Sequence, residues 1–176
     1  MKLNKALLVL AAAGFLPGFA AHAAPVEATA TLTVAAPASF QHQLTAADNV
    51  VAGKLSDDTV LAAGVVAGQQ NLTKVSLAWN RAVNPAGGTL GADYASLIRE
   101  GSVAGASDSL FVAKLEPTTA TSGKVFDKDK VTYTLTSPTQ SFNYNIVVAN
   151  KAAGVPGAEI QAGSYKMAVS AEAFFA

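Results

Sequence analysis

Apolar and polar residues alternate along most of the chain beyond residue 25, and this period of two predicts an all-β protein. In the clearest stretch, Val131, Tyr133 and Leu135 alternate with three threonines, so that one face of the strand suits a core and the other suits water. The predicted strands are 26–34, 40–45, 59–66, 72–79, 109–115, 130–136, 141–149 and 163–175.

Clusters of turn residues and one expected short helix separate the predicted strands. Glycine, proline, asparagine and serine gather at 84–88, at Ser122-Gly123 and at 152–157, and these clusters predict turns. In the stretch 92–100, the spacing of the apolar residues predicts a short helix instead of a strand. No repeat and no second domain follow from the pattern.

The two ends of the expected mature chain carry the longest alternating faces. Near the N-terminus, one face holds Val26, Ala28, Ala30, Leu32 and Val34. Near the C-terminus, one face holds Tyr165, Met167, Val169, Ala171, Ala173 and Phe175. A long apolar edge strand invites uncontrolled pairing, so we expect the last strand to be central in its sheet or covered.

The residues before the first strand have the pattern of a secretory signal. Residues 1–5 are basic, 6–19 are apolar, and 21–23 have the small-x-small form of a cleavage site. Two glycines and a proline interrupt the apolar run, which is shorter than the roughly 20 residues of a membrane-spanning helix. We therefore predict a signal peptide over residues 1–23, cut before Ala24, and an exported chain.

Composition and charge narrow the classes of function. Lysine and arginine (12) balance aspartate and glutamate (12), so no basic field exists to attract nucleic acid. The chain has no cysteine, and its fold must rely on packing and strand pairing without a disulfide. Much of its apolar content is alanine, which buries little area. A stable fold is therefore expected to need extended ladders or help from another chain.

Few residues are candidates for a catalytic or metal-binding site. Of two histidines, His22 leaves with the signal, and the lone His42 is expected to be a strand or turn side chain, so a histidine triad and a multi-histidine metal site are excluded by counting. Asp127 and Asp129 alternate as in a calcium loop, but lysines interleave and no distal glutamate follows. That pattern favours a solvated charged hairpin.

The remaining candidates also favour structural roles. Trp79 could be a sugar-stacking platform, but a core or rim aromatic on a strand is the favoured interpretation. The glycine-rich stretches lack the lysine and the helix of a nucleotide-binding loop. The sequence therefore predicts no enzyme, no cofactor and no metal.

The signal, the alternating N-terminal extension, the small all-β body and the C-terminal strand together resemble a pilin, a fimbrial major subunit of the chaperone/usher pathway. Such subunits carry a glycine fourteen residues from the end and an aromatic residue next to last, and Gly163 and Phe175 hold these places. The resemblance implies an incomplete immunoglobulin-like sandwich, completed by donor-strand addition from a neighbouring subunit. The implied organisation is a signal peptide (1–23), a donor-strand extension (24–36) and a pilin domain (37–176).

Roles and partners follow from the resemblance alone. The extension face of Val26, Ala28, Ala30, Leu32 and Val34 would be the donor strand. The acceptor groove and chaperone-binding wall would comprise Gly163, Tyr165, Met167, Val169, Ala171, Ala173 and Phe175. The implied partners are identical subunits in a homopolymer, a periplasmic chaperone, an outer-membrane usher and a host receptor, with no nucleic acid. The chain would pass through the periplasm to a fimbria on the cell surface.

Several alternatives stay open. The lack of cysteine and the use of Phe175 where the best-known branch has tyrosine leave colonisation-factor, common-pilus and capsule-like branches as candidates. An adhesin, or a module that binds glycan or protein through loops 80–92 or 150–162, is a second hypothesis. A self-contained periplasmic β-domain, in which 26–34 folds back into its own sheet, is a third.

Overall fold

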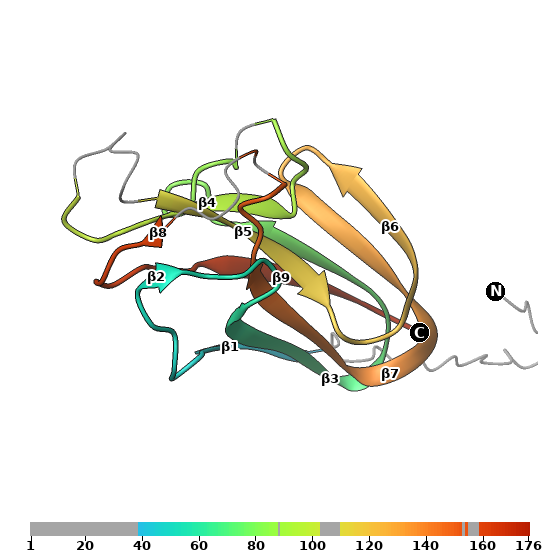
Figure 1. Cartoon of the computed structure of the whole chain (residues 1–176). Coiled ribbons are helices and arrows are strands. Elements are labelled where there is room, and N and C mark those ends of the chain that lie inside the picture. The colour runs from blue at the N-terminus through green and yellow to red at the C-terminus, as the bar shows by residue number, and fades with distance from the viewer. Residues whose placement is uncertain (1–38, 88, 103–109, 153, 155–158) are drawn as a thin grey trace, which may run out of the picture. The chain divides into compact units, whose positions relative to one another are not determined.

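Nine strands and no helix make up the part of the chain that this computed structural model describes, namely residues 39–87, 89–102, 110–152, 154 and 159–176 (Figure 1). The strands are β1 (Phe40–Ala46), β2 (Gly53–Lys54), β3 (Val60–Trp79), β4 (Tyr94–Ile98), β5 (Leu110–Pro117), β6 (Thr121–Asp127), β7 (Lys130–Val148), β8 (Glu159–Ile160) and β9 (Val169–Phe175). The predicted all-β class is confirmed. In the described residues, no helix is long and apolar enough to span a membrane.

The predicted signal peptide and donor-strand extension, 1–23 and 24–36, lie outside the described residues.

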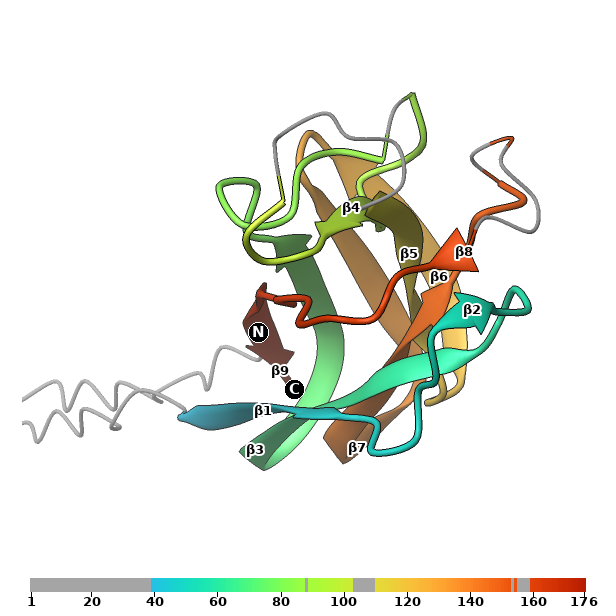
Figure 2. The ribbon, with the colours of Figure 1, turned by 60° about the vertical axis from the view of Figure 1, so that its left-hand side comes forward.

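Two long strands, β3 and β7, shape the sheet. They pair antiparallel over most of their 20 and 19 residues, with register shifts between Ala67 and Lys74. Such irregularities bend a strand, and here they let each long strand serve two layers. The first layer is β1, the first half of β3, the second half of β7, then β5 and β4; the second is β9, the second half of β3, the first half of β7 and β6. Figure 2 shows the curl that brings the layers to face each other.

The core lies between the layers and consists of alternate side chains, because a strand sends every second residue to the same face. Tyr133 and Phe142 stack at 5.6 Å between ring centroids, and Tyr144 continues the row at 6.2 Å from Phe142. The Tyr133 hydroxyl donates to the Leu115 carbonyl oxygen at 3.2 Å, which joins β7 to β5. Burial raises the pKa of Tyr133 and of Tyr144, so both hydroxyls stay neutral.

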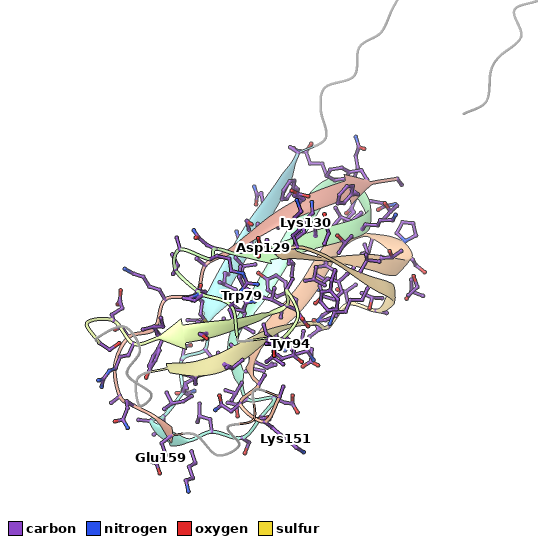
Figure 3. The ribbon with its side chains drawn as sticks, turned by 90° about the horizontal axis from the view of Figure 1, so that it is seen from above. Trp79, Tyr94, Asp129, Lys130, Lys151 and Glu159 are labelled. Atoms are coloured by element: carbon purple, nitrogen blue, oxygen red, sulfur yellow. The ribbon has the colours of Figure 1, made fainter. Side chains whose placement is uncertain are left out.

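Trp79 is a core residue, as the favoured interpretation expected. Its side chain lies inside the body of the molecule in Figure 3, and the residue is 2% exposed. The indole nitrogen donates to the carbonyl oxygen of Asp93 at 2.9 Å. A buried ring whose only N–H is already bonded cannot stack on a sugar, so the alternative interpretation is wrong.

The expected charged hairpin is also present. Lys128 and Asp129 form the two-residue turn between β6 and β7, and Asp127 pairs with Lys130 across it. Lys128 has a φ of 50°, in the left-handed region that tight hairpin turns require. Figure 3 labels Asp129 and Lys130 at this end, and Lys151 and Glu159 at the other.

The predicted helix over 92–100 is wrong. Residues Tyr94–Ile98 form β4, which pairs antiparallel with β5. Ala95 and Leu97 are buried while their neighbours are partly exposed, which is the period of a strand. Five residues are too few to separate the two periods by sequence, and the ladder with β5 decides the outcome.

Several strand boundaries also differ from the prediction. The segments 59–66 and 72–79 belong to the single strand β3, and 130–136 and 141–149 fall on β7. Ser122-Gly123, predicted as a turn, lies inside β6 at a register shift. At the C-terminus, the regular strand begins only at Val169 and not at 163.

Candidate strand-binding groove

β1 and β9 lie along the same side of β3 but on different halves of it. β1 pairs with residues 62–68 of β3, and β9 pairs with residues 72–79. The two strands meet near the bend, where a Cβ on Gly68 would lie 2.7 Å from the Phe175 ring. From there β1 runs away from the bend and β9 runs toward it, with no ladder between them in the described residues. Each strand therefore turns one unpaired backbone edge toward the other.

A cavity of about 380 Å³ opens at the wide end of this gap. Figure 2 looks toward this side, with β1 below and the chain that leads into β9 above. Its floor consists of buried core side chains, among them Leu61, Leu97 and Phe111. One wall is the chain after β1, including Val50, and the other is the segment from Ile160 to Met167. The cavity thus reaches down to the hydrophobic core between the two walls.

A second cavity of about 280 Å³ continues the first toward the bend. It lies between His42 and Leu44 of β1 on one side and residues 167–170 on the other. Met167 lines both cavities, which makes them one groove. We call this the β1–β9 groove, defined by the residues that line the two cavities.

The C-terminal wall contains the side chains predicted for it. Six predicted residues are partly buried and pack against the core cluster: Tyr165, Met167, Val169, Ala171, Ala173 and Phe175. The other face carries Lys166, Ser170, Glu172 and Phe174, which are exposed. The alternation thus places the predicted residues on the inner face of β9 and of the segment that leads into it, and their role in binding a strand or a chaperone stays a prediction.

Gly163 begins this wall. Its φ of 150° lies in the range that side chains rarely adopt, and a Cβ there would lie 2.7 Å from Cδ of Arg99. Arg99 pairs with Tyr165 in an isolated bridge, and the Glu100 N–H donates to the Ser164 carbonyl at 2.8 Å. The glycine therefore lets the chain cross close to the end of β4.

Asn84 fixes the segment that joins Gly163 to β9. The residue is fully buried, and its amide nitrogen donates to the Lys166 carbonyl at 2.8 Å. Its amide oxygen accepts the Ala168 N–H, also at 2.8 Å. Lys166 and Glu100 add an ion pair at 2.7 Å on the exposed side. The wall is thus held from behind, without using the edge that faces the groove.

His42 is a polar residue of the β1 wall of the groove. Its Nε2 lies 2.8 Å from the Tyr144 hydroxyl, and the Tyr144 ring crosses β3 directly over Gly64. Partial burial lowers the pKa of His42, so the imidazole is neutral at pH 7. His42 is a strand side chain, as the sequence predicted. Its position in the wall of the groove was not predicted.

Sequence reasoning missed the β1 wall and the floor of the groove. The alternation of His42 and Leu44 could have marked an inward face, since 40–45 was already predicted as a strand. The floor residues Leu61, Leu97 and Phe111 come from three strands far apart in sequence, and no local signal connects them. The predicted donor residues, Val26, Ala28, Ala30, Leu32 and Val34, lie outside the described part of the chain.

The arrangement suits binding of an extended chain more than chemistry. Within the described residues, no group of three or more histidine, aspartate or glutamate side chains could hold a metal ion. The groove offers two backbone edges and an apolar floor, which are the features that a β-strand recognises.

No family model matches the chain, and no curated protein sequence matches it. Several solved structures, however, are similar to this chain in fold. HdaB, the minor tip subunit of the Hda pilus of Escherichia coli, is 16% identical over 80% of this chain and 85% of its own, with a TM-score of 0.58. The SafD adhesin of Salmonella is 18% identical over 78% and 88%, with a TM-score of 0.56.

A third structure, from the AAF fimbriae of enteroaggregative Escherichia coli, is 12% identical over 77% of this chain and 88% of its own, with a TM-score of 0.57. These are a pilus subunit, an adhesin and a protein of fimbriae, and their fold is the immunoglobulin-like sandwich predicted from the sequence. The chain therefore has the fold of the chaperone/usher fimbrial subunits.

Proposed function

We propose that this chain is a structural subunit of a surface fimbria and polymerises by strand donation. In this proposal the β1–β9 groove of one copy receives residues 26–34 of the next copy. The observation that carries it is the groove itself, which reaches the core between two unpaired strand edges. A strand placed there would hydrogen bond to β1 and β9 and close the sandwich.

The chemistry of the extension suits this site. Val26, Leu32 and Val34 would each contribute roughly 1.5–3 kcal/mol when buried, before the cost of association is subtracted. Nine extended residues reach about 30 Å, at about 3.3 Å each. Two alanines, Ala28 and Ala30, stand between the larger side chains and allow close backbone approach in the middle of the strand.

The same geometry predicts an open polymer. The extension and the groove are different surfaces, so the contact is head-to-tail, and such contacts build filaments when the rotation does not close a ring. An empty groove leaves apolar wall residues such as Val50 and Met167 uncovered, so we infer that a periplasmic chaperone covers it until an outer-membrane usher delivers the next subunit. The polymer would then stand on the cell surface.

Deletion of residues 25–34 tests the proposal. The shortened subunit, produced with its chaperone, should remain chaperone-bound and should form no filaments in electron microscopy, because the groove of each neighbour stays empty. The full mature chain is the control and should form filaments. Normal filaments from the shortened chain would overturn the proposal.

An adhesive tip role is the second candidate, because two of the similar structures are a minor tip subunit and an adhesin. The AAF structure is described in terms of fibronectin binding and biofilm formation, so a host protein is one receptor class to test here. A glycan array and immobilised fibronectin, probed with purified subunit, would distinguish the two roles. Saturable binding would favour the adhesin.

A stable monomer that never assembles would favour a self-contained β-domain over both.

A further inference from the structure

β6 is the end strand of the second layer, opposite β9. It pairs with β7 on one side, and no described strand pairs with its other side. Val125 is 63% exposed and Phe126 is 50% exposed, so this edge also carries apolar side chains. An open edge of this kind can add a strand from another molecule. Without protection, this edge would be a second place at which a copy of this chain could add a strand.

An inward-pointing lysine distinguishes this edge from the β1–β9 groove. Lys124 stands opposite Tyr133, which is 1% exposed, so both side chains lie on the inner face. Its Nζ lies 2.7 Å from Oδ2 of Asp93, whose side chain is fully buried just before β4. The inner face of β9 carries only apolar side chains in the corresponding positions.

Phe126 fixes the lysine from the other side. Its ring centroid lies 4.6 Å from Nζ of Lys124, and a Cβ on Gly91 would meet both the Phe126 ring and Oδ1 of Asp93. The ammonium group is held between an aromatic face and a carboxylate. Its side chain still has 36% of its surface exposed. A strand added to β6 would remove that remaining water from a charge.

Inward-pointing charges and register irregularities are both known to keep sheet edges from pairing. β6 has both, because its register with β7 shifts between Thr121 and Gly123. We propose that the Asp93–Lys124 pair closes the β6 edge to strand addition by a second copy of this chain. In the proposed polymer, Lys124 and Asp93 would therefore determine specificity, because they would restrict strand exchange to the β1–β9 groove. This part of the inference rests on the proposed function.

Cysteine cross-linking of the full mature chain tests the closure directly. The chain has no cysteine, so Val125→Cys places a single thiol on the outer face of β6. In this background, Asp93→Asn with Lys124→Met removes both charges and leaves no unpaired charge buried. Under mild oxidation, the disulfide-linked dimer should rise about tenfold over the Val125→Cys parent, the ratio expected for loss of one modest charge penalty.

The matched control removes a different lysine–acid pair of the same charge. Lys130 and Glu172 pair at 3.2 Å on the exposed surface, so Lys130→Met with Glu172→Gln should leave the dimer fraction at the parent level. Equal dimer in the parent and in the Asp93/Lys124 variant, with near-ultraviolet circular dichroism showing a folded chain, would overturn the proposal. Abundant dimer already in the parent would overturn it too.

Hydrogen exchange of the unmodified chain covers the case in which the double variant fails to fold. Amides of β6 that face away from β7 should exchange as fast in filaments as in the chaperone-bound subunit. Slowed exchange at β6 on assembly would contradict closure of this edge. Fast exchange in filaments at the groove-facing amides of β1 and β9 would instead contradict the proposed function, so the two failures are distinguishable.

Discussion

Gly64 shows how one residue can shape the packing behind the β1 wall of the groove. A Cβ at this position would overlap the ring of Tyr144, which lies across β3 and reaches His42 on β1. The ring thus packs directly on backbone, and its hydroxyl contacts His42, which lines the groove. Only glycine leaves room for this arrangement.

Gly64→Ala should therefore destabilise the chain by about 1–3 kcal/mol, because the ring of Tyr144 must move within a packed core. Urea unfolding followed by Trp79 fluorescence measures the change. Gly123→Ala is the control, since its Cβ would meet Thr134 at an ordinary 3.7 Å. Equal effects at the two glycines would rule out the steric explanation.

His42 should make stability depend on pH. Burial lowers its pKa below the usual 6.5, so the unfolded chain takes up the proton first as the pH falls. The stability is therefore complete above about pH 6.5 and is lost progressively as the pH drops toward the folded pKa. A strand bound in the groove would bury His42 further and strengthen this dependence.

Unfolding of wild type and His42→Gln at several pH values between about 5 and 8 measures the effect. The variant should lose the acid-side decrease near the pKa of histidine, while the decrease at lower pH from carboxylates remains. If the two chains follow the same curve through this range, His42 is not the group that titrates.

At the scale of elements, the segment before β9 depends on Asn84. This side chain replaces a strand partner for residues 166 and 168, because it both donates to and accepts from their backbone. The wall of the groove therefore keeps its shape where the regular ladder with β3 has ended.

Asn84→Ala should cost about 1–3 kcal/mol, since it leaves a backbone N–H and a C=O without partners. It should also weaken binding of a peptide with the sequence of residues 25–36 to the subunit, measured by titration calorimetry. Asn143→Ala, at an exposed position of β7, is the control and should change neither quantity. Unchanged peptide binding in a destabilised Asn84→Ala chain would show that the wall does not act in binding.

Whether a strand could be predicted from the sequence depended on the residues of its inner face and on its length. The alternation of β7 was clear because its inner face carries large residues such as Tyr133 and Phe142. β6 was missed because its inner face carries Lys124, which an apolar pattern does not count. β4 was mistaken for a helix because only its ladder with β5 distinguishes the two periods.

At the scale of the whole molecule, the two layers are joined differently at their two sides. On one side, Lys124 of the second layer reaches Asp93 next to the first. On the other, β1 and β9 diverge and leave the groove open. In the proposed head-to-tail polymer, this asymmetry would direct strand donation to the side that carries the groove.

Leu32→Asp in the full mature chain should abolish filaments while leaving the subunit folded, because a carboxylate cannot enter an apolar groove without a large desolvation cost. Thr31→Asp places the same charge on the other face of the extension and should leave filaments intact. Electron microscopy, with circular dichroism as the test of folding, measures both. Equal loss in both variants would point to charge alone and not to the face of the strand.

The sequence by itself determined the all-β class and the inner face of the C-terminal strand, because a pleated strand alternates its faces whatever it packs against. It also favoured a core or rim place for Trp79 and a charged hairpin around Asp127 and Asp129, and both are present. Only the tertiary structure decided that β3 and β7 run through both layers and that Leu61, Leu97 and Phe111 meet beneath a groove. Such contacts join residues distant in the chain, and their energy comes from packing that no local pattern records.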